Sequence, residues 1–322
     1  MKVLLVSNMR PDERGIVNPI MLRMKNAIEK DERVESVDYI PFCNSFNSFS
    51  RIRNASKNYD VIHIHFGGMY ALLIWISLLG VKKKKFITFH GTDIHAKAIK
   101  TTKSIKEKIK IWMNQKASFL SILLFDKCGF VAKEMIDYVP NCFSKIISKK
   151  SFIQSLGVDY SVFKPISKDE ALEHLGITSS KKLVLFSDVA NTTIKRRDLA
   201  KSIVKELGDG FELLIMCGVV PNEVPFYINA CDCLLLTSDE EGSPNIIREA
   251  LSLNKRVYSV NVGDVEKQLC GLQNSSIISR DPIAAASTIK QSIEKTYIDN
   301  TRQARANVLD FSVLCHNVVN LY

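Results

Sequence analysis

Short apolar runs alternate with amphipathic segments along the whole chain. Residues 3–6 and 233–236 are apolar at every position, which predicts strands buried on both faces of a parallel sheet. Between such runs, apolar residues recur at helical spacing, as Ile20, Met24 and Ile28 do. This alternation of strands and helices predicts an α/β fold built on doubly wound parallel sheets.

The alternation starts again in the second half, and 322 residues favour two domains. We expect the first domain to end at Pro165. The predicted strands are residues 2–7, 37–40, 60–65, 86–90, 127–132 and 152–156 in the first half, and residues 182–187, 211–218, 231–237, 256–260 and 275–279 in the second. The main predicted helices are residues 16–30, 69–79, 169–175, 195–207, 223–230, 282–295 and 301–322.

Missing motifs argue against several classes of enzyme. The first strand is followed neither by a Gly-x-Gly-x-x-Gly turn nor by a Walker-type loop, which argues against nicotinamide dehydrogenases and NTPases. An Asp-x-Asp pair is also missing, which argues against a sugar transferase that holds its diphosphate through a metal ion. The eight cysteines have no metal-binding spacing, which fits a reduced, cytoplasmic compartment. We see no secretory signal, and the longest apolar run is shorter than the roughly 20 residues that span a bilayer.

The net charge of +10 is the sum of +13 in residues 1–165 and −3 in residues 166–322, so the first half is basic. Residues 97–116 contain seven lysines and one acid, interleaved with isoleucines and Trp112, and an apolar stretch follows to residue 125. Such a segment favours an anionic membrane surface, so we expect residues 97–125 to lie on one. A solvated helix face remains the alternative, and nucleic acid is disfavoured because the aromatic residues do not form a stacking platform.

The stretch SDEEGSPNIIREALSL, residues 238–253, has the clearest chemical character. A buried strand leads into an acidic glycine loop, and Ser243 and Pro244 are suited to cap and begin a helix. Free amides at that helix start suit an anion such as a diphosphate. Two carboxylates, Glu241 and Glu249, flank the helix start. Together they predict a ligand site at the carboxyl end of a parallel sheet.

Other candidates lie in the first half. His90, followed by Gly91, ends a predicted strand and is placed either to reach a cleft or to serve as a loop histidine held by backbone groups. His63 and His65 point to one side of their strand, where a core or cleft-edge role is favoured over a metal pair. Gly15 either brings backbone close to a phosphate or belongs to an ordinary strand-to-helix turn.

Residues 223–265 resemble the donor-binding core of the family-4 retaining glycosyltransferases, also called glycosyltransferases group 1, of the bacterial envelope polysaccharide type. Glu241 and Glu249 match the paired-glutamate motif of that family. Compatible features in the first half are the opening strand with Gly15, residues 60–65, residues 90–93 and residues 157–165. The resemblance implies the GT-B fold, with two Rossmann-like domains facing a cleft.

The resemblance also implies a role for each domain. Residues 1–165 would bind the acceptor, a saccharide or lipid-linked saccharide, and residues 166–305 would bind a UDP- or GDP-sugar. The closing segment, residues 306–322, is similar to the one that crosses back onto the first domain in this family. The implied enzyme is a metal-independent hexosyltransferase without a cofactor, peripheral to the inner face of the plasma membrane.

Individual roles follow from the same resemblance. Glu249 would hold the ribose hydroxyls, Glu241 would contact the transferred sugar, and Lys195 would neutralise the leaving diphosphate. His90 would lie beside the transferred sugar and Gly15 near the phosphates. The loop that meets the sugar and the diphosphate would consist of Gly242, Ser243, Pro244 and Asn245.

One position departs from the family pattern. Many relatives carry a phosphate-binding arginine after the first strand of the donor domain, where this chain has Asp188. A carboxylate cannot replace that cation, and Arg196 or Arg197 is available to compensate. Two alternatives stay open. The first is another GT-B enzyme, such as a phosphorylase or a nucleotide-sugar epimerase. The second is a non-catalytic GT-B binding protein, which only the Asp188 departure supports.

Overall fold

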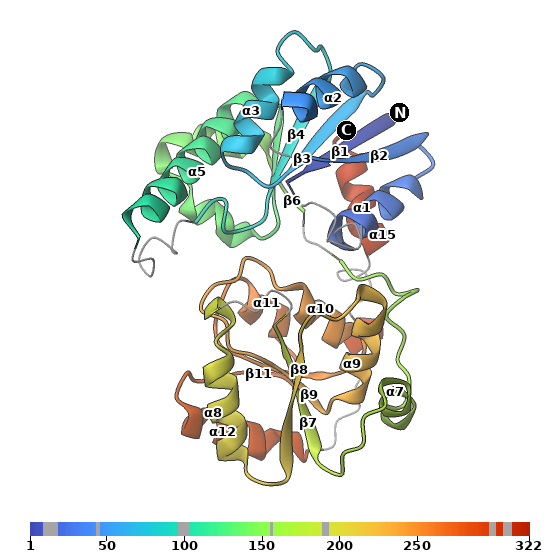
Figure 1. Cartoon of the computed structure of the whole chain (residues 1–322), viewed down its shortest axis with the longest axis vertical. Helices are drawn as coiled ribbons and strands as arrows, with labels where there is room; N and C mark the ends of the chain where they lie inside the picture. The colour runs from blue at the N-terminus through green and yellow to red at the C-terminus, as the bar shows by residue number, and fades with distance from the viewer. Residues whose placement is uncertain are drawn as a thin grey trace. The chain divides into compact units, whose positions relative to one another are not determined.

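The computed structural model describes residues 1–8, 19–42, 46–95, 104–154, 157–188, 193–295, 301–304 and 311–322. The chain forms two compact units (Figure 1). The first contains Met1–Leu156 and Phe311–Tyr322, and the second contains Gly157–Asp310. The division at Gly157 precedes the expected boundary at Pro165 by a short loop.

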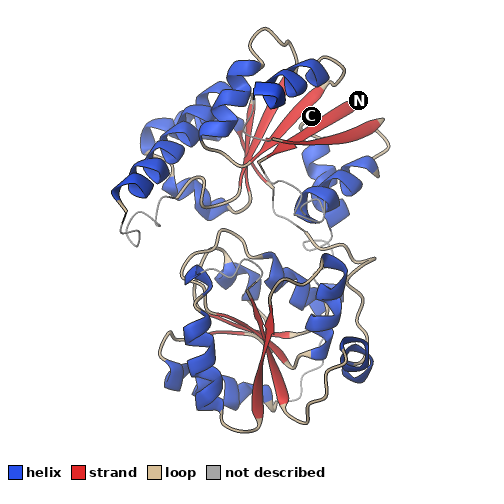
Figure 2. Ribbon diagram, in the orientation of Figure 1, coloured by secondary structure: helices blue, strands red, loops and turns tan. Residues whose placement is uncertain are grey.

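The first unit is built on a six-stranded parallel sheet with the strand order β2-β1-β3-β4-β5-β6. Its strands are β1 (Lys2–Ser7), β2 (Ser36–Pro41), β3 (Val61–His65), β4 (Lys84–Phe89), β5 (Lys127–Phe130) and β6 (Ser151–Ile153). Val3 to Val6 and Val61 to Ile64 are buried, because helices cover both faces of the sheet (Figure 2).

The helices of the first unit are α1 (Pro19–Glu29), α2 (Phe46–Ser56), α3 (Met69–Ser77), α5 (Ile105–Leu124), α6 (Ser144–Lys150) and α15 (Phe311–Val319), with 3-10 turns at Lys133–Tyr138 and Asn141–Phe143. Helices α1 and α15 pack together on one side of the sheet, and α3 and α5 pack together on the other (Figure 1). The described end of the closing segment therefore packs within the first unit.

The second unit has a five-stranded parallel sheet with the order β11-β10-β9-β7-β8. Its strands are β7 (Lys182–Ser187), β8 (Phe211–Met216), β9 (Cys233–Leu236), β10 (Arg256–Ser259) and β11 (Ser276–Ile277). Its helices are α7 (Lys168–Leu175), α8 (Arg197–Leu207), α9 (Val224–Ala230), α10 (Asn245–Ser252), α11 (Val265–Leu269), α12 (Pro282–Ile293) and α13 (Thr301–Ala304), with 3-10 turns at Thr193–Lys195 and Pro221–Glu223.

The two sheets share one topology. In each, the first strand lies between the second and the third strands of its unit, so the winding direction reverses between β1 and β3 and again between β7 and β9. In doubly wound sheets, ligands bind beyond the carboxyl ends of the strands at such a switch point. The predicted α/β class with two parallel sheets is confirmed. The topology predicts ligand sites at the loops after β1, β3, β7 and β9.

Most of the predicted elements are present, with shifted ends. Helix α5 is continuous over Ile105–Leu124, whereas the sequence pattern divided this region into a basic part and an apolar part. Helices α6 and α11 were not anticipated, since each is no longer than seven residues and has too few turns to show a helical period. No helix in the described ranges is long and apolar enough to cross a membrane.

Candidate active site

The second unit brings two of the predicted catalytic residues into contact at its switch point. Lys195 ends the 3-10 turn between β7 and α8, and Glu241 lies in the loop between β9 and α10. The Lys195 ammonium group is 2.5 Å from the Glu241 carboxylate, and the Ser238 hydroxyl donates to the same carboxylate oxygen at 2.7 Å. Residues 46 positions apart thus form one polar cluster beyond the carboxyl ends of β7 and β9.

Hydrogen bonds to backbone carbonyl groups fix these two loops to each other. The Thr237 hydroxyl lies 2.9 Å from the carbonyl oxygen of Lys195 and 3.0 Å from that of Arg196. The amide of Asp239 donates to the carbonyl of Ile194 at 2.8 Å. Because both ends of the cluster are tied to neighbouring strands, the position of the Lys195–Glu241 pair is set by the sheet itself.

Arg280 is a further residue of this site that the sequence reasoning missed. Its guanidinium donates to the carbonyl of Ser238 at 2.8 Å and to the Asp239 carboxylate at 2.9 Å. Arg280 lies just before α12, about forty positions from the loop that it holds. No local motif connects such distant positions, so only the folded chain reveals this support.

The start of α10 differs from the prediction that Ser243 caps it and that Pro244 is its first helical residue. Pro244 occupies the N-cap position, the helix begins at Asn245, and no side chain caps it. The Ser243 hydroxyl instead donates to Asp264 at 2.5 Å and accepts from Arg248, which also contacts Asp264 at 3.1 Å. Capping by Ser243 is therefore wrong, because two buried charged groups compete for its hydroxyl.

Arg248 lies on the first turns of α10 and is only 4% exposed. Burial lowers the pKa of its guanidinium, while the carboxylates of Asp264 and Glu249 oppose that shift. Glu249 itself is 7% exposed on the buried face of α10. The helix that carries the second glutamate of the motif is thus fixed by a buried ionic cluster, another feature that the sequence did not reveal.

Gly263 controls the path of the loop that contains Glu241 and Gly242. Its φ angle of +58° lies in the left-handed region that favours glycine. A side-chain carbon at this position would overlap the carbonyl oxygen of Gly242 and lie 2.9 Å from that of Glu241. The loop after β10 therefore packs backbone against backbone on the acidic loop, which requires glycine at position 263.

Asp188, which departs from the family pattern, is buried and paired. It is 2% exposed, and Arg197 donates to its carboxylate through Nε at 2.8 Å. Arg196 adopts a left-handed conformation and pairs with Asp198 at 2.8 Å and Asp239 at 3.3 Å. Both arginines considered as replacements for the missing phosphate-binding cation are thus bound to carboxylates, as Lys195 is to Glu241.

His90 lies at the end of β4 in the first unit. Its Nε2 atom is 3.1 Å from Nδ1 of His65, and its ring stacks on Phe66 with centroids 4.0 Å apart. Burial lowers the pKa of His90 to about 3. The imidazole is therefore neutral near pH 7, which suits hydrogen bonding to an uncharged polar group better than charge neutralisation.

Asp93 holds the loop that carries His90. Its carboxylate accepts hydrogen bonds from the amides of Gly67 at 2.7 Å, Gly91 at 2.8 Å and His90 at 3.0 Å. Burial raises the pKa of Asp93, and these three amides oppose the shift. Asp93 thereby ties the loop after β4 to the loop after β3, a role that its place in the sequence did not reveal.

His63 and His65 lie on the same side of β3, as predicted, with ring centroids 4.3 Å apart. Thr88 donates its hydroxyl hydrogen to Gln154, so it accepts from Nε2 of His63 at 2.8 Å. Nδ1 of His63 then accepts from the Tyr322 hydroxyl. His63 is a satisfied core residue, and no group of three or more metal-ligating side chains occurs in the described part of the chain.

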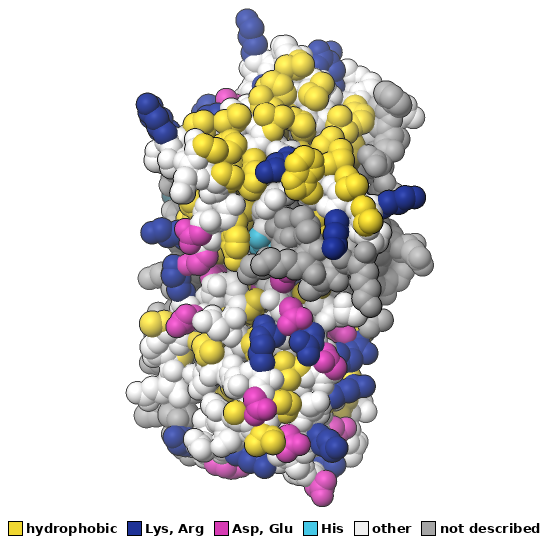
Figure 3. All heavy atoms as spheres, turned by 90° about the vertical axis from the view of Figure 1, so that its left-hand side faces the viewer, with side chains coloured by type: hydrophobic (Ala, Val, Ile, Leu, Met, Phe, Trp, Pro, Cys, Tyr) yellow, Lys and Arg dark blue, Asp and Glu magenta, His cyan; other side chains and the backbone are white. Residues whose placement is uncertain are grey.

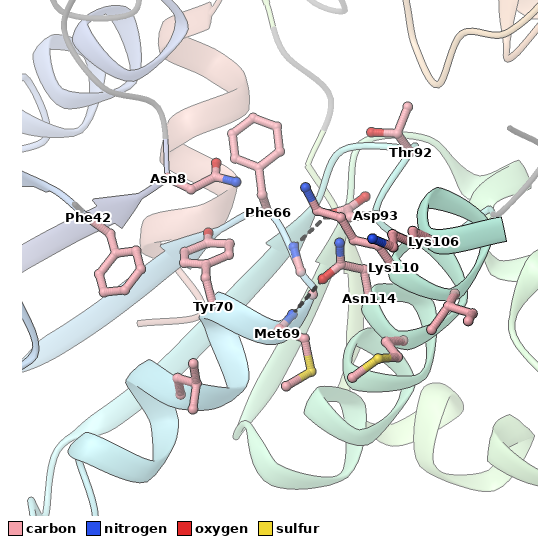
Figure 4. Close-up of a pocket in the computed structure, with 15 residues that line it drawn as sticks. Asn8, Phe42, Phe66, Met69, Tyr70, Thr92, Asp93, Lys106, Lys110 and Asn114 are labelled. Carbon is pink, nitrogen blue, oxygen red and sulfur yellow. Dashed lines mark hydrogen bonds between the residues drawn. The ribbon is translucent and has the colours of Figure 1, made fainter. Parts of the chain in front are cut away.

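A cavity of about 720 Å³ lies at the switch point of the first sheet (Figure 4). Its lining includes Asn8 after β1, Phe66 after β3, Asp93 after β4, Tyr70 from α3 and Lys110 from α5. The first unit thus has a pocket at the position where its topology predicts one. Gly15, the remaining predicted site residue, lies outside the described residues.

No protein-family model matches the sequence, and a search of curated proteins finds no match. Solved structures do match. The chain is similar to HepE from Anabaena in complex with UDP-glucose, with a TM-score of 0.73, 13% identity and coverage of 100% of this chain and 99% of that one. It is also similar to sucrose-phosphate synthase from Thermosynechococcus elongatus, with a TM-score of 0.69, 14% identity and coverage of 100% and 98%.

A UDP-GlcNAc 2-epimerase from Neisseria meningitidis, bound to UDP-GlcNAc, is a more distant match. Its TM-score is 0.59 at 14% identity, with 99% of each chain covered. At these identities the likeness establishes the fold alone. Together with the two parallel sheets, it shows that this chain has the GT-B fold of nucleotide-sugar glycosyltransferases.

Proposed function

We propose that the protein is a retaining glycosyltransferase that moves a sugar from a UDP- or GDP-sugar to a saccharide or lipid-linked saccharide during synthesis of a bacterial envelope polysaccharide. One observation carries the proposal: Lys195 and Glu241 meet at the switch point of the second sheet, on a fold shared with UDP-sugar-binding enzymes. The second unit would bind the donor, and the first would bind the acceptor.

The charge changes of the reaction account for the residues at this site. Breaking the bond between sugar and phosphate leaves negative charge on the diphosphate and positive charge on the sugar ring. Lys195 and the amides at the start of α10 would stabilise the diphosphate, since cations and helix N-termini both favour anions. Glu241 would accept from sugar hydroxyls and Glu249 from the ribose, so neither needs to act as a general acid.

The loop from Gly242 to Asn245 would lie against the sugar and the diphosphate, with its path fixed by Gly263. His90 would donate to or accept from a hydroxyl of the transferred sugar, which its neutral state permits. Gly15 would approach the phosphates. We further propose that transfer needs neither a metal nor a cofactor, and that the enzyme works in the cytoplasm at the inner face of the plasma membrane.

A transfer assay with a panel of UDP- and GDP-sugars tests the proposal. We expect one donor to be consumed only with an acceptor, with the anomeric configuration retained by NMR and with undiminished activity in EDTA. Isomerised sugar released with free UDP, and no acceptor needed, would identify an epimerase like the Neisseria enzyme of similar fold. Phosphate-dependent glycan breakdown would indicate a phosphorylase, and binding without turnover would indicate a non-catalytic protein.

A further inference from the structure

The switch-point pocket of the first unit has two chemically different walls (Figure 4). Phe42, Phe66 and Tyr70 form an aromatic wall. Lys106 and Lys110, one helical turn apart on α5, form the opposite, cationic wall. A pocket of this kind fits a ligand that has both an apolar part and an anionic part.

The positive charge of this wall is available to a ligand. Neither Lys106 nor Lys110 is paired with an acid within the described ranges. Among the described lining residues the acidic one is Asp93, and its carboxylate is occupied by the amides of Gly67, His90 and Gly91. An anion between the two ammonium groups would therefore gain charge-assisted hydrogen bonds without displacing a partner that belongs to the described residues.

An exposed apolar patch continues from the pocket over α3 and α5. The two helices are joined by hydrogen bonds from Trp75 Nε1 to the Leu124 carbonyl at 3.1 Å and from the Met69 amide to Asn114 at 3.2 Å. Figure 3 shows hydrophobic side chains gathered over this face of the first unit. We define the α3–α5 patch by six side chains that are 39% to 74% exposed: Leu73, Ile76, Ile105, Ile109, Trp112 and Met113.

The pocket and the patch are one continuous surface. Leu73, Ile109 and Met113 belong to both, so the pocket mouth lies at the edge of the patch. Patches of this kind on a folded domain mark interaction sites. The charges around it identify the partner, because α5 carries Lys106, Lys108, Lys110 and Lys116 against the single acid Glu107. An apolar face with a tryptophan and a cationic rim fits an anionic bilayer.

We propose that the pocket binds the phosphate-bearing head group of a lipid acceptor that remains in an anionic membrane. The phosphate lies between Lys106 and Lys110, the lipid chain runs along the α3–α5 patch, and the acceptor end faces the loop held by Asp93. This inference rests on the proposed function, since it specifies the acceptor of that transfer. It narrows the acceptor from saccharides in general to a saccharide that is joined to a lipid through phosphate.

Co-flotation with three kinds of vesicle tests the inference without any transfer reaction. The vesicles contain phosphatidylcholine alone, phosphatidylcholine with phosphatidylglycerol, or phosphatidylcholine with a polyprenyl phosphate at matched charge. We expect no binding to the first, binding to the second, and about tenfold tighter binding to the third, because only the polyprenyl phosphate reaches both lysines. Equal binding to the two anionic vesicles, or binding to neither, would overturn the inference.

Two pairs of substitutions separate the pocket from the patch. Lys106→Gln with Lys110→Gln should abolish the preference for the polyprenyl phosphate. Ile76→Ser with Trp112→Ser, neither of which lines the pocket, should weaken binding to both anionic vesicles by about tenfold and leave the preference intact. The control is Lys201→Gln with Lys205→Gln, two exposed lysines at the same spacing on α8, which should change nothing.

A retained preference in the pocket variant, or unchanged binding in the patch variant, would contradict the inference. Thermal unfolding of each variant checks that the fold survives, as expected for exposed positions. A separate measurement of nucleotide-sugar binding distinguishes a failure of this inference from a failure of the proposed function. Donor binding without lipid preference defeats this inference alone, whereas lipid preference without donor binding defeats the proposed function and leaves the pocket as a lipid-phosphate site.

Discussion

The ammonium group of Lys195 lies 2.5 Å from the carboxylate of Glu241, across the switch point of the second sheet. Both side chains are mostly buried, with 26% and 15% of their surfaces exposed. Each side chain neutralises the charge of the other, so neither buries an uncompensated charge before a ligand binds. A donor diphosphate would offer Lys195 a second, stronger partner and release the Glu241 carboxylate for sugar hydroxyls.

Replacing Lys195 should therefore impair chemistry more than folding. We expect Lys195→Ala to lower the transfer rate by about 10²- to 10³-fold, since one pre-aimed donor to a developing anion is typically worth that much. Lys195→Arg should retain part of the rate, because it keeps the charge. Steady-state kinetics beside Lys201→Ala, an exposed lysine on α8, provides the comparison. A Lys195→Ala enzyme with wild-type kcat would remove Lys195 from the leaving-group site.

Gly263→Ala should distort the acidic loop. The added methyl group would overlap the Gly242 carbonyl, so the backbone of Glu241 and Gly242 must shift. We expect activity to fall at least tenfold, since small displacements of positioned groups have large effects on rate. Gly271→Ala is the matched control, because its φ angle of +76° is equally left-handed but no atom lies within 4 Å of the new carbon.

Both substitutions cause a similar backbone strain, which should lower the melting temperature of both variants to a similar degree. The overlap at position 263 should lower that of Gly263→Ala further. Only Gly263→Ala should reduce turnover per folded molecule. Equal activities of the two variants would mean that the close approach of Gly263 to the acidic loop does not position the site.

Removing Arg197 should destabilise the second unit. Asp188 would stay buried but lose its guanidinium partner, and removing one partner of a buried ion pair is costly. Because Arg197 is itself one-third exposed, water can partly replace it, and we expect a loss of about 1–3 kcal/mol in the free energy of unfolding. The double variant Asp188→Asn with Arg197→Ala should recover part of that loss in urea denaturation. No recovery would show that the arginine acts by packing alone.

The buried histidines should make stability fall in acid. Burial lowers the pKa of His63 and of His90 from 6.5 to about 3, so the folded chain binds fewer protons than the unfolded chain between these values. Their contribution is complete above pH 6.5 and is lost as the pH falls toward 3.

His63→Gln should reduce that slope by the share of one histidine, which urea unfolding at a series of pH values measures directly. The variant loses stability at pH 7, because Tyr322 and Thr88 lose the imidazole between them. The slope, rather than the stability at one pH, therefore carries the prediction. An unchanged slope would mean that His63 is protonated in the folded protein.

The sequence predicts the fold well because both sheets are parallel and buried. Strands such as Val3–Val6 are apolar at every position, and this pattern repeats in both halves. The acidic loop was also visible, since Glu241, Gly242 and Glu249 are close in sequence. Local spacing therefore indicated most of the residues that we propose for the donor site.

Long-range supports could not be predicted. Arg280, which precedes α12, donates a hydrogen bond to the acidic loop. Asp264, which follows β10, accepts a hydrogen bond from the Ser243 hydroxyl. Propensity favoured Ser243 as a cap, but a tertiary contact prevailed. From the sequence, Asp188 only replaces a phosphate-binding arginine of the family pattern. The structure shows that it is buried and forms an ion pair with Arg197. Such pairings depend on which strands become neighbours.

Calorimetric titration of nucleotide sugars tests the central claim, that the second unit binds a donor through Glu249 and its neighbours. We expect at least one UDP- or GDP-sugar to bind the wild-type protein without added metal. Glu249→Gln should bind it roughly tenfold to a hundredfold more weakly, because a hydrogen bond to a charged group is lost. Glu206→Gln, at an exposed position on α8, should bind as the wild type does. No binding by any donor, or equal binding by Glu249→Gln, would contradict the account.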